Sequence, residues 1–134
     1  MFRWTVGHET FQRIRRAPAT IGTDGRPVQG AVEGTLEFKG TRAPVPDEIL
    51  ALVPEGERQA GVMFMITETE VRSTDDNTGQ AADYLLVDGE LWEVREVSWF
   101  PRVIPHYEAR IMRIKGTSGL SLAQAVALSG TTTP

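Results

Sequence analysis

The sequence predicts a mainly β fold: a small antiparallel β-barrel of about six or seven strands, with one short helix and long loops. Apolar residues recur with a period of two along several segments, which is the pattern of a half-buried strand. An Asp-Gly pair at residues 88–89 separates two β-rich runs, as in a two-residue hairpin. A long helical periodicity is missing, and closing the sheet into a barrel removes edges that invite aggregation.

The earlier predicted strands lie in the first half of the chain. Residues 2–6 alternate between apolar and polar side chains. Val32, Leu36 and Phe38 also alternate with polar residues, so we expect them to share one face of a strand. Residues 61–71 are apolar on both faces at first and polar on one face later. This pattern predicts a strand that is covered at one end.

The clearest local signal is a hairpin around the Asp-Gly pair, with strands at residues 84–87 and 90–100. Such a pair prefers a type I′ turn, because both central residues need a positive φ. The second strand breaks its alternation at residues 95–96. A β-bulge there would keep Trp92 and Trp99 on the same inward face. We therefore expect both tryptophans to pack in the core.

Glycine and proline residues predict where the remaining loops and turns lie. Residues 20–30 are rich in Gly, Pro and Asp and predict a loop. Residues 40–61 form a long connection with a short helix, which Pro46 starts and Pro54 stops. The last predicted strand covers residues 106–115, with apolar residues alternating along it.

We expect a single β-barrel domain over residues 1–115 and a C-terminal extension or arm over residues 116–134. Ser121 and Gln124 have the spacing of a capping box. A short helix there is marginal alone, so the extension either docks on a neighbouring subunit or frays. Residues that line or end such a helix are Leu122, Val126, Leu128 and Gly130.

The composition fits a protein made in a reducing cytoplasm and without a membrane segment. The chain has 134 residues and no cysteine, which excludes a disulfide scaffold and thiolate metal sites. No stretch approaches the roughly 20 apolar residues that cross a bilayer. The N-terminal residues lack the apolar run of a signal peptide.

The charge pattern argues against a protein that grips nucleic acid. The formal net charge is −4, whereas phosphate binding usually needs a basic surface. Arg13, Arg15 and Arg16 form the only dense basic cluster, which we interpret as the solvated end of a strand. Aromatic residues could stack on bases, as on an OB-fold, but core packing is the better interpretation of the tryptophans.

The sequence contains no recognisable pattern for catalysis, metal binding or cofactor binding. Neither of the two histidines, His8 and His106, has a metal-binding spacing. Ser98 and Ser121 lack a nucleophile elbow, and no glycine-rich phosphate loop is present. Residues 75–77 predict a turn, because the further ligands of a calcium loop are missing. We therefore expect no enzyme activity and no cofactor, and a structural hydrogen bond for His106.

Two residue patterns carry a resemblance to a known family. In the first, a short helix runs into a PEGxR turn, a glycine and a strand, here Pro54, Glu55, Gly56, Arg58 and Gly61. In the second, a hairpin of the form D-x5-G-x-x-[YW]-x-V is followed by an aromatic strand end, an HY pair and a strand ending in Arg, here Asp83, Gly89, Trp92, Val94, Trp99, His106, Tyr107 and Arg113. Over residues 28–115 the chain resembles the small head-closure (stopper) and head–tail connector proteins of the tailed-bacteriophage neck.

The resemblance implies a structural virion protein, made in the bacterial host. Such proteins resemble one another as small β-barrels that assemble into a homo-oligomeric ring, sixfold or twelvefold, at the head–tail junction. The ring joins the portal or adaptor above to the tail terminator, tail tube or collar proteins below. It helps to retain and gate the packaged DNA, which passes through the lumen without sequence-specific binding.

Three alternatives and one structural expectation accompany this hypothesis. The chain could be a tail terminator or another neck-ring protein. From other classes, an OB-like nucleic-acid-binding module predicts salt-dependent binding, and a small enzyme predicts a polar pocket with perturbed titratable groups. Within the first pattern, we expect Gly56 to permit a turn and Arg58 to hold backbone carbonyls or Glu55.

Overall fold

The computed structural model describes residues 9–129 except residues 19, 29, 76 and 115. The alternation predicted at residues 2–6, together with His8 and Gly130, lies outside the described residues. No helix in the described part of the chain is long and apolar enough to span a membrane.

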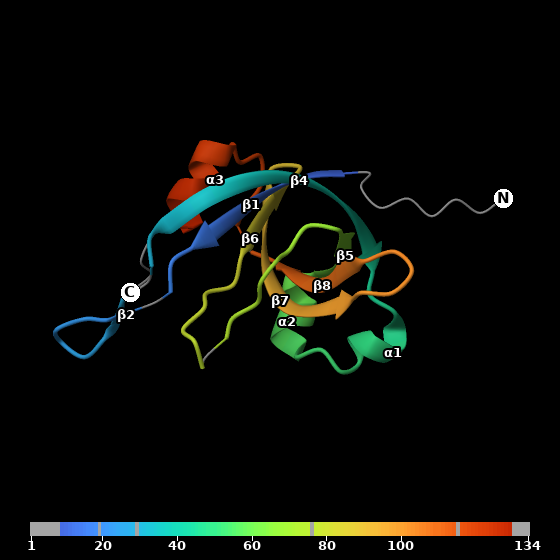
Figure 1. Ribbon diagram of the computed structural model, residues 1–134, viewed down its shortest axis with the longest axis horizontal. Coiled ribbons are helices and arrows are strands. Elements are labelled where there is room, and N and C mark those ends of the chain that lie inside the picture. Colours follow the sequence, from blue (N-terminus) through green and yellow to red (C-terminus); the bar gives the residue numbers. More distant parts are fainter. Residues whose placement is uncertain (1–8, 19, 29, 76, 115, 130–134) are drawn as a thin grey trace.

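Six strands close into one antiparallel barrel in the order β1–β4–β5–β8–β7–β6 (Figure 1). They are β1 (Glu9–Arg16), β4 (Val32–Pro44), β5 (Val62–Thr67), β6 (Tyr84–Val87), β7 (Glu90–Phe100) and β8 (His106–Arg113). The short strands β2 (Thr20–Ile21) and β3 (Pro27–Val28) pair separately. The predicted mainly β barrel is therefore confirmed, with six strands in its wall.

The barrel interior holds the main hydrophobic core. Phe11 of β1 and Phe38 of β4 stack there with their ring centroids 5.3 Å apart. Each fully buried large apolar side chain contributes about 1.5–3 kcal/mol relative to exposure. The buried members of this cluster are Phe11, Phe38, Met65, Val71, Leu85, Val87, Trp92, Val94, Ala109 and Ile111.

The β6–β7 hairpin matches its sequence prediction. Asp88 has φ +51° and Gly89 has φ +76°, as a type I′ turn requires. The β7–β8 register shifts between Val94 and Glu96, which confirms the β-bulge. Trp92 is buried in the core, also as expected.

Several segments differ from the sequence prediction. The strand expected over residues 61–71 ends at Thr67, and Val71 reaches the core from the loop that follows. Residues 20–28 form the β2–β3 hairpin where we expected a loop. β4 continues to Pro44, so the expected long connection from residue 40 is shorter.

Val32 does not share the face of Phe38, contrary to the alternation. Gly34 pairs with Arg15, but Val32 pairs with Arg16, so β4 bulges between them. The bulge turns Val32 to the outer surface, where it packs on a second cluster. The buried members of this second cluster are Ile14, Leu86, Leu91 and Ala125.

Two short helices connect β4 to β5, where the sequence predicted one helix and a turn. α1 (Asp47–Leu50) and α2 (Glu55–Ala60) each follow a proline, which can precede a helix because it needs no N–H partner. α2 covers the expected PEGxR turn. Gly56 therefore lies inside a helix, and a Cβ there would meet no atom within 4 Å. The turn-permitting role expected of Gly56 is wrong.

The C-terminal helix α3 (Leu122–Ser129) begins with the predicted capping box. The Ser121 amide donates to Gln124 Oε1 at 2.9 Å, and the Gln124 amide donates to Ser121 Oγ at 3.2 Å. These two bonds satisfy amide groups that a helix start otherwise leaves unpaired.

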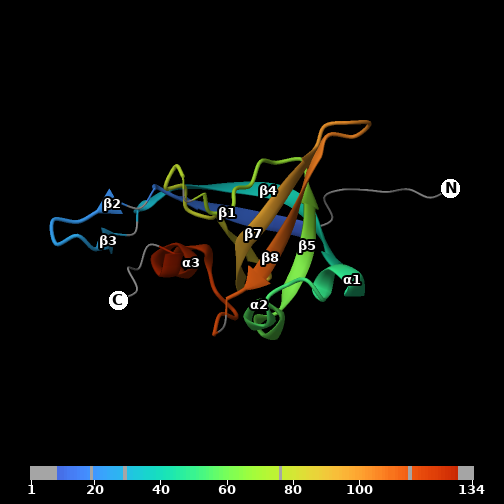
Figure 2. The same ribbon diagram turned by 90° about the horizontal axis from the view of Figure 1, so that it is seen from below.

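α3 packs on the outer surface of the barrel of its own chain, where we expected docking on a neighbour or fraying (Figure 2). Ala125 is fully buried against Ile14 and Leu86, and Val126 packs beside it. Leu122 and Leu128 remain exposed, so the helix turns a different face inward than the leucines suggested.

The segment that leads to α3 crosses the β6–β7 turn at Gly89. The Leu120 amide donates to the Gly89 carbonyl at 2.9 Å. A Cβ on Gly89 would lie 2.9 Å from the Gly119 nitrogen. Gly89, singled out in the sequence pattern, is therefore needed both for its positive φ and for this close approach.

Replacing Gly89 with alanine is expected to lower the free energy of unfolding by about 2–3 kcal/mol, from φ strain and overpacking together. The matched control is Gly25→Ala, because Gly25 has φ +80° and a Cβ added there would meet no atom within 4 Å. That change should cost only about 1 kcal/mol. Urea unfolding measures both, and equal losses would show that the Gly119 contact is unimportant.

Candidate functional site

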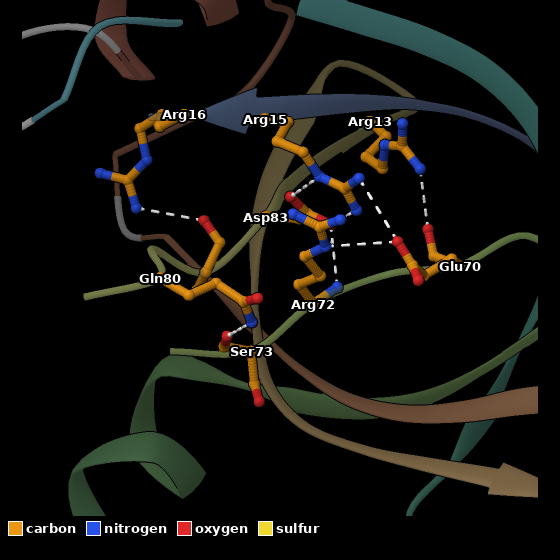
Figure 3. Close-up of polar contacts among 9 residues, drawn as sticks. Arg13, Arg15, Arg16, Glu70, Arg72, Ser73, Gln80 and Asp83 are labelled. Carbon is orange, nitrogen blue, oxygen red and sulfur yellow. Dashed lines mark hydrogen bonds and ion pairs between the residues drawn. The ribbon is translucent and has the colours of Figure 1, made fainter. Parts of the chain in front are cut away.

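A buried ion pair fastens the connection between β5 and β6 to strand β1 (Figure 3). Asp83 is fully buried. Arg15 donates to it from Nε at 3.0 Å and from Nη2 at 2.8 Å, and the Arg72 amide donates at 2.9 Å. The hydrogen bond to Asp83 is the main cause that raises the pKa of Arg15.

The neighbouring arginines are also engaged inside the chain. Arg13 Nη1 donates to the Glu70 carbonyl at 2.9 Å, and burial lowers the pKa of Arg13. Arg16 lies over the Tyr84 ring, 4.2 Å from its centroid, and donates to the Ala82 carbonyl. The expectation that this basic cluster is a solvated strand end is therefore wrong. These arginines hold the β5–β6 connection.

A second ion-pair cluster fastens α2 to the β7–β8 hairpin through Glu57. Arg95 Nε donates to Glu57 Oε1 at 2.9 Å, and Arg110 Nη1 donates to Glu57 Oε2 at 2.6 Å. The Glu57 side chain is only 10% exposed. Sequence reasoning selected Glu55 and Arg58 of the same helix, which are exposed. The burial of Glu57, which distinguishes it from Glu55, becomes visible only in the structure.

Glu57→Gln is expected to lower the free energy of unfolding by about 1.5–3 kcal/mol, the range for a hydrogen bond to a charged group. The two arginines donate to different oxygens of Glu57, and the glutamine turns an N–H group toward one of them. Glu55→Gln is the control, because Glu55 is exposed and should change stability by at most about 0.5 kcal/mol. Chemical denaturation compares the two variants. Indistinguishable midpoints would show that the Glu57 ion pairs do not fasten α2 to the β7–β8 hairpin.

The β7–β8 hairpin projects past the barrel and exposes large apolar residues at its tip (Figure 2). Trp99, Phe100 and Ile104 are each 42–48% exposed, and Val103 is fully exposed. Trp99 lies on the predicted face and packs against Tyr107, with the ring centroids 4.4 Å apart and the planes tilted by 39°. It is nevertheless not in the core as predicted, because the hairpin here has left the barrel.

Val103 adopts φ +63°, which is unfavourable for a β-branched residue. The surrounding turn holds it there: the Ile104 carbonyl lies 2.8 Å from His106 Nδ1, and the His106 ring stacks on Phe100. This is the structural hydrogen bond expected of His106. An exposed, strained apolar residue of this kind is a candidate contact site.

Beside the tip lies a cavity of about 300 Å³ between α1 and the outer face of the hairpin. Ile49, Phe64 and Phe100 give it apolar walls. Its polar wall consists of Glu96, Ser98, Glu108 and Arg110. We call the cavity and the tip together the apolar end, formed by Ile49, Phe64, Trp99, Phe100, Val103 and Ile104.

The residues of the two sequence patterns fall in three places. The first pattern lies on α2, between the N-cap Pro54 and Gly61, whose φ of +106° ends the helix. A second group supports the barrel, namely Asp83, Gly89, Trp92, Val94 and Arg113. The third group lies at the apolar end, namely Trp99, His106 and Tyr107. The aromatic residues of this third group lie beside the exposed hairpin tip.

Within the described residues, no group of three or more His, Cys, Asp or Glu side chains could hold a metal ion. No protein-family model and no curated protein matches this chain. Its function is therefore inferred from the apolar end and from the residue patterns over residues 28–115.

Proposed function

We propose that this chain is a structural subunit of the neck of a tailed bacteriophage, in a ring that joins the portal or adaptor of the head to the tail and helps to retain the packaged DNA. The observation that carries the proposal is the apolar end. It presents exposed aromatic and aliphatic side chains on a projecting hairpin, as expected of a surface that becomes buried on assembly.

The closed barrel supports an assembly role of this kind. All six wall strands have two neighbours, so strand addition at a sheet edge is not the natural mode of contact. Contacts must then use loops and hairpin tips, which a rigid barrel can hold in place. The β7–β8 hairpin is anchored through Glu57 and its two arginines, so its tip is presented by a stiff support.

Electrostatics support a lumen that DNA passes without being held. The chain has a formal net charge of −4, and its densest basic cluster is engaged by Asp83 and by the Glu70 carbonyl. The guanidinium groups of this cluster are therefore engaged inside the chain and less able to bind phosphates. Trp92, a possible base-stacking residue of an OB-like module, is buried.

In vitro joining tests the proposal. Heads from a phage mutant lacking this chain are mixed with tails, with and without the purified protein, and infectious particles are counted. Without the protein, we expect the heads to leak DNA and to accept no tails. When the protein is added, we expect the heads to accept tails. Normal joining without the protein would overturn the proposal, and salt-dependent DNA binding by the purified chain would then favour the nucleic-acid-binding alternative.

A further inference from the structure

The β2–β3 hairpin is a second exposed apolar feature, at the opposite end of the molecule from the apolar end (Figures 1 and 2). Ile21 is 71% exposed and Val28 is 43% exposed. The hairpin is closed by a turn in which the Gly22 amide donates to the Arg26 carbonyl at 2.8 Å. The molecule therefore carries a narrow apolar projection at one end and an apolar cavity at the other.

The β2–β3 hairpin and the cavity are complementary in charge as well as in apolar character. Arg26 on the β2–β3 hairpin has a side chain 86% exposed and only a long 3.9 Å ion pair, to Asp24. The cavity carries two carboxylates on its polar wall, Glu96 with a side chain 68% exposed and Glu108 with one 34% exposed. The projection therefore combines apolar side chains with a guanidinium, and the cavity combines apolar walls with carboxylates.

We propose that the β2–β3 hairpin of one copy inserts into the cavity of the next copy, with Ile21 and Val28 against Ile49, Phe64 and Phe100, and Arg26 against Glu96 or Glu108. The inference rests on the proposed ring function and names its lateral interface. Two different patches at opposite ends make a head-to-tail contact, which closes into a ring when the rotation between copies allows it.

Cross-linking tests this interface cleanly, because the chain contains no cysteine. The variant Ile21→Cys/Ile49→Cys is treated with a short bismaleimide, both as concentrated free protein and on heads reconstituted with it. We expect a ladder of covalent multimers that ends at one closed species, whose mass gives the copy number. Each single variant should remain monomeric. The matched control, Ile21→Cys/Glu37→Cys, places the second thiol on the exposed outer face of β4 and should give no ladder.

The outcomes separate this interface from the ring function. If the wild-type protein restores joining but the double variant gives no ladder, the interface is overturned and the neck function stands. If the double variant gives a ladder but the wild-type protein does not restore joining, the interface is supported and the neck function is rejected. Failure of both would reject both. Covalent dimers from Ile49→Cys alone would indicate a twofold contact between cavities and would overturn the head-to-tail arrangement.

Discussion

Asp83→Asn is expected to lower the free energy of unfolding by about 3–5 kcal/mol, the cost of breaking a buried ion pair from one side. Asp83 is fully buried, and Arg15 donates to both of its carboxylate oxygens. The asparagine keeps the shape but presents an N–H group to one of the guanidinium donors. The largely buried Arg15 charge then keeps only its longer, 3.5 Å ion pair with the half-exposed Glu70.

The control is Asp24→Asn, the same chemical change at an exposed turn residue. It should alter stability by at most about 0.5 kcal/mol. Urea unfolding with identical slopes compares the two variants. If Asp83→Asn proves as stable as Asp24→Asn, the pair does not fasten the β5–β6 connection.

Val103→Asn is expected to reduce head–tail joining at least a hundredfold without weakening the fold. Losing an apolar contact that acts as a hot spot costs about tenfold or more in affinity, and a ring repeats the contact in every subunit. Asparagine tolerates a positive φ better than valine, so the φ of +63° becomes less strained. The free energy of unfolding should therefore stay equal or rise.

The matched control is Leu128→Asn on α3, which also removes an exposed apolar side chain, but outside the apolar end. It should join heads to tails at the wild-type level. Undiminished joining by Val103→Asn, or an equal loss in Leu128→Asn, would show that the hairpin tip has no special role in assembly.

The parts of the fold set by local chemistry could be predicted from the sequence. The Asp88-Gly89 turn, both strands that flank it and the bulge in β7 follow from turn preferences and alternation over a few residues. The capping box at Ser121 is equally local. In each case the interacting groups are close along the chain, so spacing alone identifies them.

The parts set by distant contacts could not be predicted in this way. Arg15 and Asp83 are 68 residues apart, and Glu57 and Arg110 are 53 apart. Their pairing depends on how the barrel closes. Trp99 shows a related difficulty, because alternation identifies the face of a strand but not the point where the strand leaves the core.

The candidate site was only partly visible in the sequence. The aromatic strand end and the HY pair that follows it fall at the hairpin tip. Ile49 could not be placed there, because its position depends on where α1 packs. The β2–β3 hairpin was missed as well, since strands of two residues carry almost no periodic signal.

The most direct test of the proposed neck function is a cryo-EM reconstruction of the phage particle whose genome encodes this chain. The proposal predicts a ring of six-stranded barrels on the portal axis, between portal and tail, with the β7–β8 tips buried against other neck subunits. Absence of the chain from that position, or its presence there with the tips exposed to solvent, would contradict the proposal.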